Sequence, residues 1–95
     1  MKNEFENLFQ TIIKRSKTSS DKSYTKKLLK SGPKKISQKL GEESTELVID
    51  YLKGTKKRTI EEAVDLIYHL FVLLHSKKIS LKDIEKEIHK RKNVR

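Results

Sequence analysis

The sequence is organised around one acidic stretch, Gly41-Glu-Glu-Ser-Thr-Glu46, which places three carboxylates among residues with the apolar spacing of a buried helix. At about 100° per residue, Glu43 lies along the edge of the apolar stripe, and Glu46 follows one turn later on the same side. Helix residues three apart have Cβ atoms about 5–6 Å apart, so these two can bind one divalent cation, whereas Glu42 points about 100° away. The stripe consists of Ile36, Leu40, Leu47, Val48 and Tyr51.

A second acidic pair with the same spacing, Glu62 and Asp65, follows further along the chain. Two helices that each carry an acid-x-x-acid pair predict a magnesium site, because this cation prefers oxygen ligands. Glu62 also has a competing structural role, since Thr59 three residues earlier would make the two a capping box at a helix start. Four converging carboxylates should repel one another, which predicts that at least one has a pKa above the unfolded value of about 4.

Length and composition favour one domain over residues 1–95, and the absence of cysteine excludes disulfides and thiolate metal sites. The first residues lack the apolar run of a secretory signal, so we expect a cytoplasmic protein. The longest apolar run, Leu66–Leu74, has nine residues and is far shorter than the roughly 20 that cross a bilayer. It predicts a core helix that is apolar nearly all round. One subunit of this size cannot easily cover such a helix, so we expect a homodimer that buries it.

The formal net charge of +10 is concentrated between Lys14 and Lys39, where ten basic residues face a single acid, Asp21. Such a run predicts a polyanionic partner: nucleic acid, an anionic lipid surface or the phosphates of a nucleotide. The alternative is a lysine-rich composition that only keeps a small protein in solution. The charge alone leaves these choices open.

Helical periodicity and capping residues divide the chain into four or five helices, and no segment has the alternation of a strand. Asn3 is the expected cap of the first helix, Pro33 suits the first turn of the third, and Gly54 is expected to end that helix in a left-handed conformation. A basic hairpin at 55–58 and a frayed basic tail at 89–95 are also expected. The predicted helices cover residues 4–17, 24–30, 33–53, 60–76 and 81–88.

Three kinds of function fit an all-helical chain with two acidic pairs. In the first, Mg²⁺ bridges the carboxylates to a phosphorylated substrate, and the basic run holds the rest of the anion. A ferritin-like di-iron site is disfavoured, because none of His69, His75 and His89 stands three residues after a glutamate. Nucleic-acid binding without catalysis is disfavoured too, since an acidic cluster in the core would serve no purpose and the aromatic residues have mostly core spacing.

Four blocks of sequence resemble phosphoribosyl-ATP pyrophosphohydrolase, an enzyme of histidine biosynthesis. They are Ser23-Tyr-Thr-Lys-Lys-Leu-Leu29, Gly32-Pro-Lys-Lys-Ile36, Lys39-Leu-Gly-Glu-Glu43 with Glu46, and Glu62-Ala-Val-Asp-Leu-Ile-Tyr-His-Leu70. The resemblance extends from about Phe5 to Ile88. The acidic pattern alone is shared by the wider all-α nucleotide pyrophosphohydrolase superfamily, while the first two blocks favour the narrower family.

This resemblance implies an all-α bundle of four to five helices, a homodimer, and Mg²⁺-dependent hydrolysis of phosphoribosyl-ATP to phosphoribosyl-AMP and pyrophosphate, with Mn²⁺ as a substitute ion. Many family members are fused to a cyclohydrolase domain. We expect a separate phosphoribosyl-AMP cyclohydrolase as the pathway neighbour here, and neither nucleic acid nor a membrane as a partner. The alternative is a housekeeping pyrophosphohydrolase that acts on other nucleoside triphosphates.

The resemblance also assigns roles to individual residues. Glu42 and Glu43 match catalytic acids, with Glu42 either a metal ligand or the base that orients water. Tyr68 and His69 belong to a family-like block, and either core packing or a supporting hydrogen bond would explain them. The implied metal ligands are Glu43, Glu46, Glu62 and Asp65, and the expected substrate-binding residues are Lys34, Lys35 and Lys39, with Tyr24 and Lys27 on a segment that closes over the substrate.

Overall fold

The computed structural model describes residues 3–19 and 22–92 and contains five helices, with no strand in these two ranges. The all-α prediction is therefore confirmed. Asp21, the one acid of the basic run, lies outside the described residues. The helices are α1 (Glu4–Ser16), α2 (Tyr24–Ser31), α3 (Pro33–Lys53), α4 (Lys56–Ser76) and α5 (Leu81–Arg91).

Side-chain caps fix the starts of three helices at the predicted residues. Asn3 Oδ1 accepts a 2.9 Å hydrogen bond from the Glu6 amide at the start of α1, and Ser23 Oγ accepts one from the third residue of α2. Ser80 and Asp83 form a capping box at α5. Each such cap satisfies an amide that the helix itself leaves unpaired. The expected fraying from residue 89 is wrong for residues 89–91, because α5 continues to Arg91.

The turn between α3 and α4 differs from the prediction. Gly54 has an extended backbone with φ −94°, not a left-handed one, and a Cβ at this position would lie 2.7 Å from Asp50 Oδ1. Glycine is needed here for close approach to the preceding turn. Helix α4 begins directly afterwards, with Thr55 Oγ1 accepting a 3.1 Å hydrogen bond from the Arg58 amide. The basic hairpin and the Thr59 cap were therefore wrong predictions.

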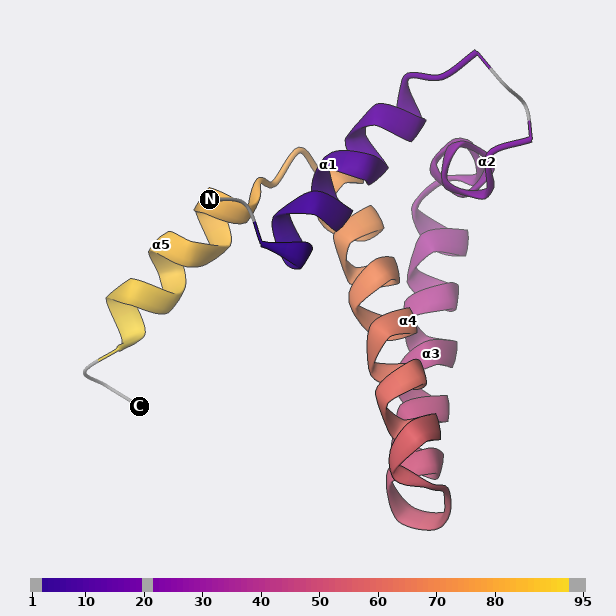
Figure 1. The fold of residues 1–95 in the computed structure, drawn as a ribbon. Coiled ribbons are helices and arrows are strands. Elements are labelled where there is room, and N and C mark those ends of the chain that lie inside the picture. The colour runs from indigo at the N-terminus through magenta and orange to yellow at the C-terminus, as the bar shows by residue number, and fades with distance from the viewer. Residues whose placement is uncertain (1–2, 20–21, 93–95) are drawn as a thin grey trace.

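Helices α3 and α4 form a long antiparallel pair, and the other three helices gather at one end of it (Figure 1). Helix α1 packs on the C-terminal half of α4, and α2 packs beside the first turns of α3. Helix α5 extends away from this body after a short connection (Figure 1). No helix of the described residues combines the length and the apolar composition needed to span a membrane.

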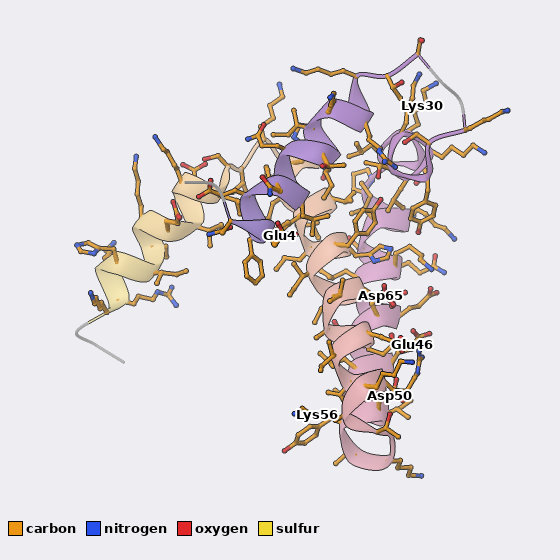
Figure 2. The ribbon with its side chains drawn as sticks, in the orientation of Figure 1. Glu4, Lys30, Glu46, Asp50, Lys56 and Asp65 are labelled. Carbon is orange, nitrogen blue, oxygen red and sulfur yellow. The ribbon has the colours of Figure 1, made fainter. Side chains whose placement is uncertain are left out.

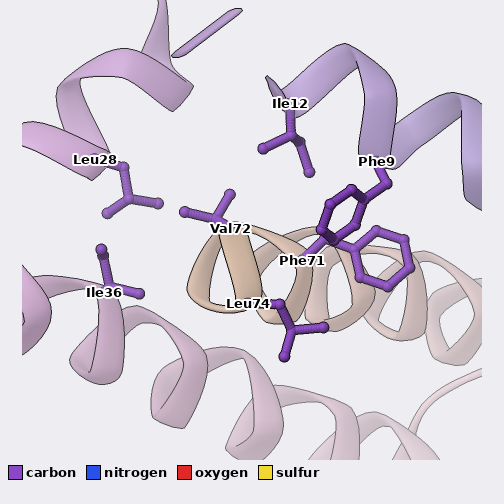
Figure 3. Packing of buried hydrophobic residues seen from close by; sticks show 7 residues of the cluster. All are labelled: Phe9, Ile12, Leu28, Ile36, Phe71, Val72 and Leu74. Atoms are coloured by element: carbon purple, nitrogen blue, oxygen red, sulfur yellow. The ribbon is translucent and has the colours of Figure 1, made fainter. Parts of the chain in front are cut away.

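The hydrophobic core lies where α1 and α2 cover the α3/α4 pair (Figure 3). Val72 of α4 is fully buried at its centre, and the rings of Phe9 and Phe71 meet edge to face with centroids 5.2 Å apart. Each such side chain stabilises the fold by roughly 1.5–3 kcal/mol relative to exposure. The buried cluster consists of Phe9, Ile12, Leu28, Ile36, Phe71, Val72 and Leu74.

The apolar surface that remains uncovered is not the predicted one. Within Leu66–Leu74, four residues are buried and only Leu70 is classed as exposed, because α1, α2 and α3 cover this stretch within one subunit. No helix of the described residues covers the other half of the α3/α4 pair (Figure 1). The exposed apolar residues there, which we call the distal apolar surface, are Val48, Ile49, Tyr51, Leu52, Ile60 and Val64.

Candidate metal and nucleotide site

Three carboxylates from the two long helices meet beside the α3/α4 contact. Glu43 lies in the middle of α3, and Glu62 and Asp65 lie one turn apart on α4. One carboxylate oxygen from each of the three lies within 4.8 Å of the other two. The antiparallel pairing of the helices therefore brings together acids that are about twenty positions apart in the sequence. We call these three residues the carboxylate cluster.

Two members of the cluster are buried without full hydrogen bonding. Glu43 is 8% exposed and Glu62 is 4% exposed, and Oε2 of each has no hydrogen-bond partner among the described residues. Burial raises the pKa of Glu43, and the neighbouring Glu46 and Asp65 raise it further. Burial likewise raises the pKa of Glu62, followed by its closeness to Glu46. The predicted rise in a carboxylate pKa is confirmed, although loss of water is a larger cause than repulsion.

Arg58 holds the other oxygen of Glu62. Its Nη2 donates a 2.6 Å hydrogen bond to Glu62 Oε1, and its Nη1 donates one of 2.8 Å to Glu61. This contact joins residues four apart on α4, so it exists only because the helix begins before Arg58. The sequence predicts a hairpin at 55–58, so spacing alone does not single out Arg58. A helix start at Thr55 would have placed Arg58 one turn before Glu62.

Glu46 lies at the edge of the carboxylate cluster. It is exposed, and its charge raises the pKa of both Glu43 and Glu62. Figure 2 shows Asp65, Glu46 and Asp50 in succession along the same side of the α3/α4 pair. The four predicted metal ligands are therefore neighbours, with three in the cluster and Glu46 beside it.

The donor set suits a hard divalent cation. The buried, unpaired oxygens of Glu43 and Glu62 have lost hydration without gaining a hydrogen bond, a costly state that an ion with oxygen ligands would relieve. Asp65 is exposed, so the cluster is open to solvent on one side. Magnesium usually keeps open positions for water and phosphate oxygens, and the cluster fits that requirement.

Glu42 lies outside the carboxylate cluster, as its helical position predicts. It is exposed and accepts hydrogen bonds from Gln38 Nε2 at 3.0 Å and from Lys39 Nζ at 3.3 Å. The hydrogen bond from Gln38 lowers its pKa most, followed by the one from Lys39. The lowered pKa favours the ionised form of Glu42, whereas burial raises the pKa of Glu43 and of Glu62.

The predicted phosphate-binding lysines lie on the first turns of α3 and on α2. Lys39 pairs with Glu42, and this hydrogen bond raises its pKa, with smaller contributions from Tyr24 and Glu43. Lys34 and Lys35 are exposed, and the charge of Lys35 reaches Glu42. Lys27 is exposed on α2. These cations lie on the side of the carboxylate cluster towards α2. Lys39 also interacts with the cluster itself, because its charge lowers the pKa of Glu43.

Two contacts between aromatic and polar side chains fasten α2 to α4 next to the cluster. His69 Nδ1 lies 2.8 Å from the Asp65 carbonyl oxygen, so it carries a proton and donates it there. Nε2 of a neutral His69 then accepts from the Tyr24 hydroxyl at 3.2 Å. The Tyr68 hydroxyl hydrogen-bonds to Thr25. His69 is buried and Tyr68 is half-buried, and both hold α2 against α4. Tyr24 is 51% exposed.

Comparison with known proteins points to the same chemistry. The chain matches the family model described as phosphoribosyl-ATP pyrophosphohydrolase over residues 5–92. It is 45% identical over 91 residues to the phosphoribosyl-ATP pyrophosphatase of Bacillus cytotoxicus, covering 96% of this chain and 85% of that protein. It is 44% identical over 91 residues to the phosphoribosyl-ATP pyrophosphatase of Bacillus thuringiensis, with the same coverage.

A longer relative shows the same domain in a larger protein. The histidine biosynthesis bifunctional protein HisIE of Staphylococcus aureus is 44% identical over 92 residues, which cover 93% of this chain and 44% of that protein. The chain thus spans less than half the length of the bifunctional relatives. Since the family model covers nearly the whole chain and the shorter relatives match almost end to end, this protein belongs to the phosphoribosyl-ATP pyrophosphohydrolase family.

Proposed function

We propose that this protein hydrolyses phosphoribosyl-ATP to phosphoribosyl-AMP and pyrophosphate, with Mg²⁺ held by Glu43, Glu62, Asp65 and Glu46. The observation that carries this proposal is the carboxylate cluster, with two buried oxygens that have no hydrogen-bond partner among the described residues. Family membership supplies the substrate and the pathway, histidine biosynthesis. Bound Mg²⁺ would neutralise phosphate oxygens, and Mn²⁺ offers the same oxygen chemistry.

The side chains around the cluster have complementary tasks. Lys39, Lys35 and Lys34 bind phosphate oxygens, and Lys27 and Tyr24 approach the nucleotide from α2. Cleavage of a phosphoanhydride depends mainly on positioning and on neutralising charge, which these cations provide. Arg58 keeps the Glu62 carboxylate in one orientation from the opposite side. His69 keeps α2 and its lysines in place through Tyr24.

Glu42 is the group that we assign to the attacking water. Its lowered pKa keeps it ionised, and it lies one position from Glu43, outside the cluster. Both its oxygens are engaged here, by Gln38 and by Lys39. A phosphate that attracts Lys39 would free one oxygen to accept a proton from water. Glu43 contributes to catalysis through the cation.

We further propose that the active form is a homodimer in which the distal apolar surface is buried. The Cα radius of gyration of 14.7 Å exceeds the roughly 12 Å typical of a compact domain of this length. Six apolar side chains, each more than half exposed, lie on the two long helices. Several large apolar side chains left exposed on one pair of helices are typical of an association site. A cytoplasmic location and a cyclohydrolase that consumes the product complete the proposal.

The direct test of the substrate is a comparison of purified protein on phosphoribosyl-ATP, ATP, dUTP and dCTP, each with Mg²⁺, with pyrophosphate release as the readout. We expect strong preference for phosphoribosyl-ATP and loss of turnover in EDTA. Rapid turnover of dUTP or dCTP without turnover of phosphoribosyl-ATP would instead support the alternative, a housekeeping pyrophosphohydrolase. That alternative shares the carboxylate cluster, so only the substrate panel separates the two.

A further inference from the structure

A basic hollow lies between the end of α1 and the start of α2, apart from the carboxylate cluster. Its volume is about 800 Å³, and no acidic side chain of the described residues lines it. Lys14, Arg15 and Lys17 come from the last turn and cap of α1, and Ser23 is the cap residue of α2. We call this feature the α1–α2 hollow.

The three cations of α1 that line the hollow have no carboxylate partner among the described residues. Lys14, Arg15 and Lys17 form no ion pair with any carboxylate in residues 3–19 and 22–92. Three like charges on adjacent turns repel one another, so an anion between them would be favoured. The positive end of α2 begins at Ser23 on the same hollow and adds to this preference. The hollow therefore suits a phosphate group.

Aromatic side chains connect the hollow to the carboxylate cluster. The charge of Arg15 reaches the Tyr68 hydroxyl, and the Tyr68 ring stacks with Tyr24 at a centroid distance of 6.2 Å. Tyr24 in turn contacts His69, whose Nδ1 lies 2.8 Å from the carbonyl oxygen of Asp65 in the cluster. Tyr24, which is 51% exposed, is thus in contact both with Tyr68, near Arg15 of the hollow, and with His69, near the cluster.

Phosphoribosyl-ATP has a matching distribution of charge. Its adenine carries the triphosphate-bearing ribose on one side and a second ribose with a single phosphate on the other, so the base lies between two anionic ends. ATP lacks the second ribose and its phosphate. A site that separates the two nucleotides must therefore recognise the second phosphate at a distance from the metal.

We propose that the α1–α2 hollow binds the phosphate of the phosphoribosyl group, through Lys14, Arg15 and Lys17, while the carboxylate cluster takes the triphosphate. The adenine then lies against the Tyr24 ring between the two sites. This assignment rests on the proposed function for the identity of the substrate. It makes the three cations of α1 determinants of specificity, distinct from the lysines of α3 that bind the triphosphate.

The test uses the product, since phosphoribosyl-AMP retains the second phosphate but lacks the pyrophosphate that meets the metal. Binding of phosphoribosyl-AMP and of AMP is measured by titration calorimetry for the wild type, Arg15→Ala, Lys14→Ala and Arg15→Lys. We expect the wild type to bind phosphoribosyl-AMP more tightly than AMP. Each alanine variant should lose about tenfold in affinity for phosphoribosyl-AMP with little change for AMP, because one charge-assisted contact is removed.

Arg15→Lys should retain most of the affinity, and Lys86→Ala, an exposed cation on α5, should change neither ligand. Equal losses for both nucleotides, or no loss in Arg15→Ala, would overturn the assignment, as would a wild type that does not distinguish the two. Failure of the proposed function looks different: no pyrophosphate release from phosphoribosyl-ATP, even where Arg15-dependent binding of phosphoribosyl-AMP is found.

Discussion

Arg58 Nη2 donates a 2.6 Å hydrogen bond to Oε1 of Glu62, while Oε2 of the same carboxylate is buried with no hydrogen-bond partner among the described residues. Arg58 thus holds one oxygen of Glu62, and the other oxygen is available to an ion. This arrangement orients the carboxylate before any ion binds, and it compensates part of the cost of burying its charge. The contact explains how an acid that is 4% exposed can exist so close to two others.

Removal of this contact should destabilise the protein mainly when no metal is present. We expect Arg58→Ala to melt at a clearly lower temperature than the wild type in EDTA at pH 7, because Glu62 keeps a buried charge without its cation. Added Mg²⁺ should recover part of this loss by binding the native state. Thermal melts with EDTA and with Mg²⁺ measure both effects.

A matched control is available in α5. Arg91 donates a 2.7 Å hydrogen bond to Glu87, also four residues apart, but both side chains are about half exposed. Such a surface pair contributes about 0.3–0.5 kcal/mol, so Arg91→Ala should shift the melting temperature only slightly. Glu61→Gln isolates the second contact of Arg58. If Arg58→Ala proved as mild as Arg91→Ala, the compensation of Glu62 by Arg58 would be excluded.

The carboxylate cluster should lower the stability of the metal-free protein, and bound Mg²⁺ should raise it again. We expect Asp65→Asn to melt at the same or a higher temperature than the wild type in EDTA, because one of the repelling charges is gone. The same variant should gain less from added Mg²⁺ and should lose turnover. Melting curves with and without Mg²⁺ decide the matter. Clear destabilisation in EDTA with a full magnesium shift would make Asp65 a structural residue.

Glu62→Gln provides a further check on the helix start. A capping role after Thr59 would have made this change costly, but the amide next to the α4 cap is satisfied by Thr55. The remaining cost is the weaker contact with Arg58, set against relief of repulsion from Glu46. In Glu62→Gln the weaker contact with Arg58 lowers the stability, and the relief of repulsion from Glu46 raises it.

The pH dependence of stability should carry the signature of raised carboxyl pKa values. Glu43 and Glu62 bind protons more tightly in the folded chain than in the unfolded one, whose glutamate pKa is about 4.3. Their destabilising contribution is therefore complete above the folded pKa and fades as the pH falls towards about 4.3. We expect the free energy of unfolding in EDTA to be higher at pH 5 than at pH 7.5.

Groups with lowered pKa act in a different range. The backbone amide and hydroxyl of Ser80 lower the pKa of Asp83, so its stabilising contribution is lost only as the pH falls below about 4.

Saturating Mg²⁺ should reduce the difference in the free energy of unfolding between pH 5 and pH 7.5, and Glu43→Gln should reduce the same difference in EDTA. Urea titrations at the two pH values measure the effect. A wild type more stable at pH 7.5 than at pH 5 in EDTA would contradict the assignment.

Periodicity and capping residues predicted most of the fold. The cap at Asn3 and the starts of α3 at Pro33 and of α5 at Leu81 lie where the sequence places them, because each depends on a few neighbouring residues. The acidic pairs could be placed on two helices for the same reason. Their meeting across α3 and α4 required only that a short turn make the helices antiparallel.

The start of α4 could not be chosen from the sequence. Thr55 and Thr59 are four residues apart, and both precede residues that can complete a helical cap. The structure selects Thr55, and the Thr59 hydroxyl instead donates to the carbonyl oxygens of Asp50 at 3.2 Å and of Thr55 at 2.9 Å. Asp50 belongs to the preceding helix, so local spacing does not reveal this partner. A helix start at Thr59 would leave Arg58 outside the helix, so the contact between Arg58 and Glu62 is not predicted either.

Periodicity also identified apolar faces without identifying what covers them. Ile36 and Tyr51 belong to one predicted stripe, yet Ile36 is 3% exposed and Tyr51 is 74% exposed. The difference arises because α2 packs beside only the first turns of α3 (Figure 1). Coverage depends on the packing of distant helices, so the expectation that one subunit cannot cover Leu66–Leu74 is wrong, while the dimer stays a prediction.

The proposed dimer can be tested on the distal apolar surface. Leu52 is 70% exposed, so Leu52→Lys should leave the subunit folded while placing a charge in the interface. We expect the wild type to sediment as a dimer at micromolar concentration and the variant to shift towards a monomer. Ile88→Lys on α5, where the native side chain is 63% exposed, serves as the control. A well-folded wild-type monomer would end this proposal.

The measurement that tests the account most directly is pyrophosphate release from phosphoribosyl-ATP by the wild type, Glu43→Gln and Glu85→Gln at a series of Mg²⁺ concentrations. Glu85 is exposed on α5, outside the cluster, and serves as the matched control. We expect turnover that requires Mg²⁺, is lost in Glu43→Gln by at least about 100-fold, and is unchanged in Glu85→Gln. Turnover by Glu43→Gln at the wild-type rate, with the same dependence on Mg²⁺, would contradict the claim that the carboxylate cluster is the catalytic centre.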